Sequence, residues 1–88
     1  MIDLEYAPKF LRQLHKLEKN IQEEAIKKIS LFKNPKNHRS LNVHKLHGHL
    51  KDRYAFYITN RIRILFKFQN SRFASLLAVD DHDIYKRS

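Results

Sequence analysis

Hydrophobic and polar positions alternate at the start of the chain. In the segment IDLEY, Ile2, Leu4 and Tyr6 alternate with two acidic residues. A period of two is typical of a strand that has one face buried. We therefore predict an N-terminal strand that ends at Ala7.

After this strand, the apolar residues take the spacing of a helix. Pro8 suits the first helical turn, where its missing N–H has no intrahelical partner, and the pattern extends to about Lys19. Asn20 followed by Glu23 has the form of an N-cap with a reciprocal acidic residue, and a second stripe extends to Asn34. The apolar positions of the two stripes are Phe10, Leu11, Leu14, Leu17 and Ile21, then Ala25, Ile26, Ile29 and Phe32. We predict an antiparallel pair of helices.

A polar segment, NPKNHRS at 34–40, follows the second helix. Its composition is typical of a loop, and we expect it to be the most mobile part of the chain. His38 belongs to this loop. His15, beside Leu14 on the first helix, is expected at the surface or its boundary.

Beyond Arg53 the period returns to two, which predicts strands at 54–58 and 62–68. A two-residue connection would place the apolar sets of these strands on opposite faces. A three-residue loop at 59–61 instead pairs Ile58 with Ile62 and places Tyr57 opposite Arg63. We predict the three-residue loop.

The remaining sequence predicts one more strand and a short end segment. QNSR at 69–72 reads as a turn, FASLLAVD at 73–80 as a strand buried on both sides, and 81–88 as a short helix or tail. The predicted fold class is α+β in a single domain, 1–88. It consists of an N-terminal strand, a helical hairpin packed on one face, and an antiparallel sheet of three to four strands whose other face is partly open.

The charge of the chain favours a polyanionic partner. Eighteen Lys and Arg against nine Asp and Glu give a net charge of +9 and a pI near 10. Nucleic acid is the first candidate and an acidic protein the second, because neutralised phosphates release counterions. Solubility alone is the simplest alternative. The chain has no cysteine and shows no signal peptide or membrane-spanning segment, so we expect a soluble cytoplasmic protein without a membrane partner.

Three of the six histidines lie close together in NVHKLHGHLKDRY, residues 42–54. His44, His47 and His49 could supply three nitrogen ligands to zinc, but their spacing is not that of a known zinc site. On a strand, His47 and His49 would share a face that His44 does not, and the neighbouring cations oppose a bound dication. We therefore expect no metal and no other cofactor.

The order of these elements, with the segments HKLHGHLKDRYAFYI, RIRILFKF and HDIYK, resembles the RelE/ParE superfamily of bacterial toxins over nearly the whole chain. Within it, the RelE and YafQ-like mRNA interferases are most similar. The resemblance implies the toxin of a type II toxin–antitoxin system. Such a protein is a small basic ribonuclease that cuts mRNA in the ribosomal A site and is neutralised by a cognate antitoxin.

The resemblance also implies site residues. Those with catalytic roles in the family fall here on His44, Arg63, His82 and Tyr85, and the basic residue after the glycine falls on Lys51. In the middle strands, Tyr57 and Arg61 replace a histidine and an aspartate of YafQ-like toxins. Other basic and aromatic positions are expected to bind RNA, which gives the set Lys45, His47, His49, Lys51, Arg53, Tyr57 and Arg61.

RNA carries its own nucleophile, the 2′-OH, so cleavage needs a base, a cation for the phosphorane and an acid for the leaving oxygen. Histidine is largely neutral at pH 7, and nearby cations favour that form. We expect His44 as base, Arg63 on the phosphate and His82, between two aspartates, as acid or phosphate contact. Tyr85 could stack on a base, act as an acid or dock the tail. The rival functions are a ParE-like gyrase poison and a non-catalytic module that binds RNA or a protein partner.

Overall fold

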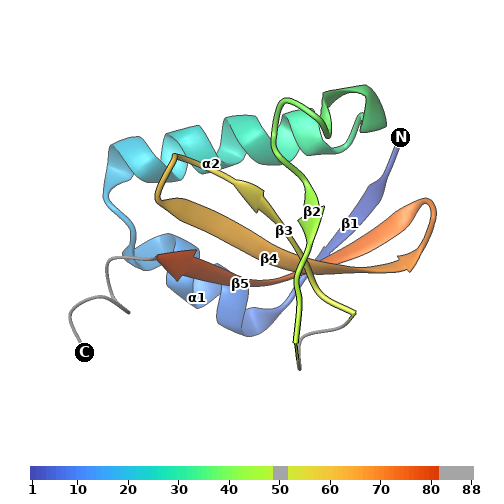
Figure 1. The fold of residues 1–88 in the computed structure, drawn as a ribbon. Helices are drawn as coiled ribbons and strands as arrows, with labels where there is room; N and C mark the ends of the chain where they lie inside the picture. The colour runs from blue at the N-terminus through green and yellow to red at the C-terminus, as the bar shows by residue number, and fades with distance from the viewer. Residues whose placement is uncertain (49–51, 82–88) are drawn as a thin grey trace.

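The structure, a computed structural model, describes residues 1–48 and 52–81. One sheet of five strands forms a layer, and two helices pack against it (Figure 1). The strands lie in the order β1-β5-β4-β3-β2. The elements in chain order are β1 (Asp3–Tyr6), α1 (Pro8–Lys16), α2 (Lys19–Phe32), the 3₁₀ turn η1 (Pro35–Asn37), β2 (His44–Lys45), β3 (Tyr54–Tyr57), β4 (Ile62–Asn70) and β5 (Phe73–Asp81).

The predicted α+β fold class is confirmed, but the sheet differs from the prediction in two ways. It is mixed, because β1 pairs in parallel with β5, from Asp3 opposite Phe73 to Tyr6 opposite Leu76. It also has a fifth strand, the short β2, at its other edge. A period of two identifies a strand but contains no information on its direction or its distant partner. β2 has only two residues, which is too short to show a period.

The β3–β4 hairpin has the predicted register. Tyr57 lies opposite Arg63, and the Ile58 N–H donates to the Ile62 carbonyl at 2.8 Å. The Thr59 hydroxyl oxygen accepts hydrogen bonds from the backbone N–H groups of Arg61 at 3.2 Å and Ile62 at 3.0 Å. The three-residue connection at 59–61 therefore aligns the apolar sets of both strands on one face, as their common period requires.

The helices fill that face. Phe32 of α2 lies near the centre of the core, with its ring stacked on Phe56 at a centroid distance of 4.5 Å and edge-on to Phe66 at 4.7 Å. Phe10 of α1 is fully buried in the same cluster. The complete cluster is Ile2, Phe10, Ala25, Ile29, Phe32, Leu41, Phe56, Ile58, Ile62, Ile64, Phe66, Ala74 and Leu76. None of the described helices is long and apolar enough to cross a membrane.

The boundary between the helices is not where the sequence placed it. α1 ends at Lys16, and α2 begins at Lys19 with Glu18 in the N-cap position, so the predicted N-cap at Asn20 is wrong. The amide of Gln22 instead donates to the carbonyls of His15 at 3.0 Å and Leu17 at 2.8 Å. These bonds occupy carbonyl groups that the end of a helix leaves without partners.

The polar segment 34–40 is held against the end of α2. The His38 ring stacks on Phe32 at 4.7 Å, and its Nε2 bonds to the Phe32 carbonyl at 2.8 Å. The Asn37 amide donates to the Leu31 carbonyl at 2.9 Å. This segment was expected to be the most mobile, yet its polar side chains complete the backbone hydrogen bonding of the helix end. The short helix or tail predicted for 81–88 lies, apart from Asp81 in β5, outside the described residues.

Candidate functional site

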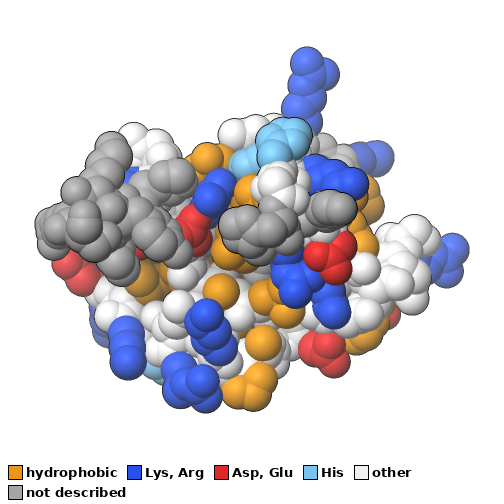
Figure 2. Space-filling view, turned by 60° about the horizontal axis from the view of Figure 1, so that its bottom comes forward, with side chains coloured by type: hydrophobic (Ala, Val, Ile, Leu, Met, Phe, Trp, Pro, Cys, Tyr) orange, Lys and Arg blue, Asp and Glu red, His pale blue; other side chains and the backbone are white. Residues whose placement is uncertain are grey.

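The candidate site lies on the face of the sheet that the helices do not cover. Strand pairing places His44 beside Ala55, and Tyr57 in a row with Arg63 and Asp80. Paired residues in neighbouring strands project to the same side, so these side chains share the open face. Figure 2 shows the molecule from below, where Lys and Arg side chains outnumber acidic ones and histidine lies at the upper margin.

His44 is held in one orientation by two neighbours. Its Nδ1 lies 2.8 Å from the backbone carbonyl of Asn42, and its ring stacks with that of Tyr57 at a centroid distance of 5.9 Å and an interplanar angle of 22°. A carbonyl oxygen can only accept a hydrogen bond, so Nδ1 must carry the proton. In the neutral ring, Nε2 then has a lone pair, which is what a general base needs.

Arg63 projects from β4 onto the open face, but it is more covered than an ordinary surface arginine. Its Nε donates to Asp80 Oδ2 at 2.6 Å, and the side chains of Arg63 and Asp80 are only 19% and 6% exposed. Asp80 Oδ1 is buried and has no hydrogen-bond partner among the described residues. The carboxylate therefore fixes the guanidinium through one nitrogen and leaves the two terminal nitrogens as donors.

Tyr57 connects the two groups. It stacks on His44 from one side and lies directly across from Arg63 on the other. β2 and β4 are separated by β3 alone, so their backbones lie about 10 Å apart at the usual strand spacing. Side chains as long as histidine and arginine can contact one phosphodiester across that span.

The other predicted RNA-binding residues have different surroundings. Lys45 pairs with Tyr54, so its exposed side chain lies on the helical side of the sheet, away from His44. Arg53 bonds to Asp52 at 2.9 Å, and Arg61 lies 3.7 Å from Asp81. His47 is exposed just beyond β2. The predictions for His49, Lys51, His82 and Tyr85 lie outside the described residues.

Lys67 and Asp80 also lie on this face, and neither was identified as a site residue from the sequence. Lys67 follows Arg63 by four positions on β4, so the period of two places both on the open face. The sequence placed Asp80 at the end of a strand but did not identify it as the hydrogen-bond partner of Arg63. Within residues 1–48 and 52–81, no three His, Cys, Asp or Glu side chains are arranged to hold a metal ion.

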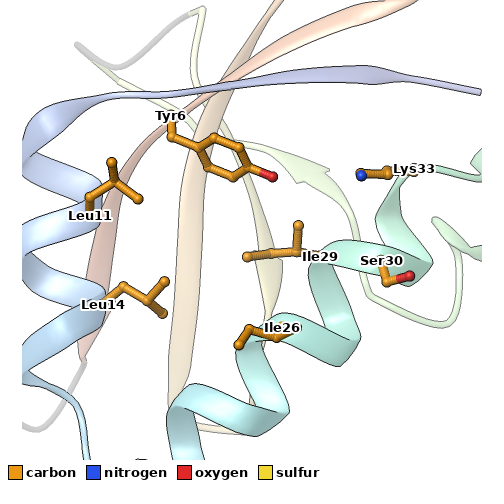
Figure 3. A pocket seen from close by; sticks show the side chains of 7 residues that line it. All are labelled: Tyr6, Leu11, Leu14, Ile26, Ile29, Ser30 and Lys33. Carbon is orange, nitrogen blue, oxygen red and sulfur yellow. The ribbon is translucent and has the colours of Figure 1, made fainter.

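A groove on the helical side of the sheet is mostly apolar, unlike the open face. It has a volume of about 330 Å³ and lies between α1, α2 and β1 (Figure 3). Its lining is Tyr6, Leu11, Leu14, Ile26, Ile29, Ser30 and Lys33. This lining is mostly hydrocarbon and offers no base or acid pair, so the groove suits contact with a protein better than catalysis.

The shape of the chain is shared with known toxins. No protein-family profile and no curated protein sequence matches it. Among solved structures, YafQ from E. coli strain BL21(DE3) matches with a TM-score of 0.76 at 11% identity, over 97% of this chain and 98% of that one. The E. coli DinJ–YafQ toxin–antitoxin complex gives 0.73 at 14% identity over 94% of each chain. The archaeal RelE–RelB complex from Pyrococcus horikoshii OT3 gives 0.69 at 15%, over 92% and 94%.

The chain has the RelE/YafQ toxin fold. The resemblance predicted from the residues is therefore confirmed at the level of the fold. At identities of 11% to 15%, the RelE/YafQ fold does not by itself assign side chains to a reaction. The assignment must rest on the residues of this chain, of which His44, Tyr57 and Arg63 are the three predicted site residues that lie together on the open face.

Proposed function

We propose that residues 1–88 form the toxin of a type II toxin–antitoxin pair, and that this toxin is an endoribonuclease acting on mRNA in the ribosomal A site. The fold shared with YafQ and RelE toxins supports the toxin role. The net charge of +9 supports a polyanionic substrate. The geometry of His44 on the open face supports catalysis.

The proposed reaction is an in-line attack of a ribose 2′-OH on the adjacent phosphorus. His44 Nε2 removes the 2′ proton, and the terminal nitrogens of Arg63 donate to the phosphorane oxygens. The 5′-oxygen leaves with a proton from an acid, for which His82 and Tyr85 are the candidates. The products are a 2′,3′-cyclic phosphate and a 5′-hydroxyl, and the reaction requires no metal or other cofactor.

One observation above all supports this proposal. The Asn42 carbonyl holds the proton of the His44 ring on Nδ1, and Nε2 makes no hydrogen bond within the described part of the chain. A histidine that merely filled surface area would not need a fixed tautomer. A base with an available lone pair, on the same face as a guanidinium, is what RNA cleavage by its own 2′-OH requires.

The proposal is tested by His44→Gln in a cell-free translation reaction with a defined mRNA. We expect the wild-type chain to cut ribosome-bound mRNA, and His44→Gln to cut at least about 100-fold more slowly, because a general base contributes about 10² to 10⁴. His15→Gln is the matched control. His15 is exposed on α1 outside the open face, so this variant should retain the wild-type rate.

The alternative functions give different results in the same reaction. A ParE-like gyrase poison would leave the mRNA intact and cause DNA breaks when gyrase is present. A binding module would slow translation without any cut product. Wild-type cleavage by His44→Gln would contradict the role of His44, and intact mRNA with the wild-type chain would end the nuclease proposal.

The proposed protein partner is a cognate antitoxin. The similar structures include the DinJ–YafQ toxin–antitoxin complex and the RelE–RelB complex. With a net charge of +9, this chain favours an acidic segment in its partner. Because ribosomes and mRNA are its proposed targets, the proposed place of action is the cytoplasm.

A further inference from the structure

The turn that leads into β2 contains a residue with unusual backbone geometry. Asn42 has a φ of 55°, and it is the one residue other than glycine with a positive φ within 1–48 and 52–81. This left-handed conformation is open to glycine, tolerated by asparagine and aspartate, and strongly disfavoured for branched side chains.

The bonds around Asn42 require the turn. Before it, Leu41 is buried in the core and its carbonyl accepts from the Tyr57 N–H at 3.1 Å. After it, the Val43 N–H donates to the His38 carbonyl at 3.0 Å. The backbone is therefore fixed by hydrogen bonds on both sides of Asn42, and Asn42 is the residue between them that takes the left-handed conformation.

This turn determines where the Asn42 carbonyl points. In an extended strand, carbonyl groups lie in the plane of the sheet and side chains project out of it. The carbonyl of one residue therefore does not face the side chain two positions later. Here the Asn42 carbonyl lies 2.8 Å from Nδ1 of His44, which is two positions later.

We propose that Asn42 is a positioning residue, whose left-handed backbone holds the His44 ring with its proton on Nδ1 and its lone pair on Nε2. The importance of this for catalysis rests on the proposed function, whereas the tautomer itself does not. Asn42 acts through its main chain, so its side chain is dispensable. Tyr57 limits rotation of the ring by stacking, and the carbonyl selects the tautomer.

Two measurements on the full chain test this. The first is the long-range ¹H–¹⁵N correlation spectrum of the His44 ring at alkaline pH, where the ring is neutral. We expect a pyrrole-type Nδ1 and a pyridine-type Nε2, whereas a free histidine side chain prefers the proton on Nε2. The second is the rate at which Asn42 variants cleave mRNA, measured together with their affinity for RNA.

Asn42→Gly keeps the left-handed backbone, so the tautomer and the cleavage rate should stay within twofold of wild type. Asn42→Val disfavours that backbone, so the proton should shift towards Nε2. The cleavage rate should then fall at least tenfold, with kcat reduced and KM little changed, because RNA binding does not need the lone pair. If Asn42→Val does not fold, Asn42→Ala gives the same comparison with a smaller backbone penalty.

A wild-type ring protonated on Nε2 would overturn the proposal, whether or not mRNA is cut. Loss of the Nδ1 proton in Asn42→Gly would also overturn it, since the Asn42 side chain would then be responsible. Retention of the Nδ1 proton in a folded Asn42→Val or Asn42→Ala variant would overturn it as well. An Nδ1 proton combined with undiminished cleavage by His44→Gln would leave the positioning of the ring intact and contradict the proposed function alone.

Discussion

Arg63 and Asp80 form an ion pair that is largely removed from solvent on the open face. Their Nε–Oδ2 distance is 2.6 Å, and neither side chain is more than 19% exposed. Moving an isolated charge out of water costs several kcal/mol, so each group of such a pair is tolerated because of the other. Asp80 thus explains how an arginine can be held in place and largely buried in the middle of a sheet surface.

Asp80→Ala should therefore destabilise the chain strongly, since it leaves a guanidinium largely buried without its acceptor. We expect a loss of about 3 kcal/mol in the free energy of unfolding, at the low end of the range for buried pairs because Arg63 keeps some exposure, measured by urea denaturation. The double variant Arg63→Leu/Asp80→Leu should lose less than Asp80→Ala alone, because it removes both charges together.

Asp52→Ala is the matched control for this measurement. Asp52 pairs with Arg53, but its side chain is 78% exposed, and surface pairs of this kind contribute at most about 1 kcal/mol. Equal losses for Asp52→Ala and Asp80→Ala would show that the central pair is solvated in solution, and that Arg63 is not held as described.

At the scale of elements, the helical hairpin is closed by a side chain rather than by a cap at the start of α2. Gln22 donates to two carbonyls near the end of α1, and no side-chain hydrogen bond caps α2. The first bonds of α2 are accepted by the Glu18 carbonyl, from the N–H groups of Ile21 and Gln22. One residue of α2 thereby links the start of α2 to the end of α1.

Gln22→Ala should lower the free energy of unfolding by about 1 to 3 kcal/mol, because it removes two hydrogen bonds worth about 0.5 to 1.5 kcal/mol each. Asn20→Ala tests the opposite view, in which the Asn20 side chain caps the helix. The structure predicts a change of less than about 0.5 kcal/mol for an exposed residue without such a bond. A larger loss for Asn20→Ala than for Gln22→Ala in thermal or urea unfolding would favour the sequence-based cap.

Local patterns predicted the elements well, whereas contacts between distant elements were missed. The β3–β4 register followed from two runs of period two and a short loop. The turn after β4 was placed at 69–72, which would put Phe68 opposite Phe73 and Ala78 opposite Arg63. In the structure, Asn70 pairs with Phe73, so the turn is shorter, and after two register shifts along the strand pair Asp80 comes opposite Arg63 instead.

The same limit applies to the site. The composition and the resemblance identified His44 and Arg63, but the partners that give them their chemistry come from elsewhere. The carbonyl that faces His44 depends on a backbone turn at Asn42, which apolar periodicity does not encode. The carboxylate on Arg63 comes from another strand, 17 residues away in sequence. Hydrogen-bond partners of this kind follow from three-dimensional packing rather than from residue spacing.

At the scale of the whole molecule, the net charge of +9 can attract RNA without directing it to any one face. The strands give the direction, because Arg63 and Lys67 project from β4 on the side that α1 and α2 leave uncovered. If the open face is the RNA site, a cation on it and a cation on the helical layer should contribute unequally, although both change the net charge by the same amount.

Lys67→Gln and Lys27→Gln make this comparison, since Lys27 is exposed on α2. In a His44→Gln background, which prevents cleavage, the affinity for a short single-stranded RNA is measured by fluorescence anisotropy over a range of salt concentrations. Each phosphate contact on a single strand contributes about 0.7 to the slope of log K against log salt. Lys67→Gln should therefore reduce the slope by about 0.7, while Lys27→Gln should leave it nearly unchanged. Equal reductions would mean that RNA responds to the overall charge of the molecule, and that the sheet face is not its binding surface.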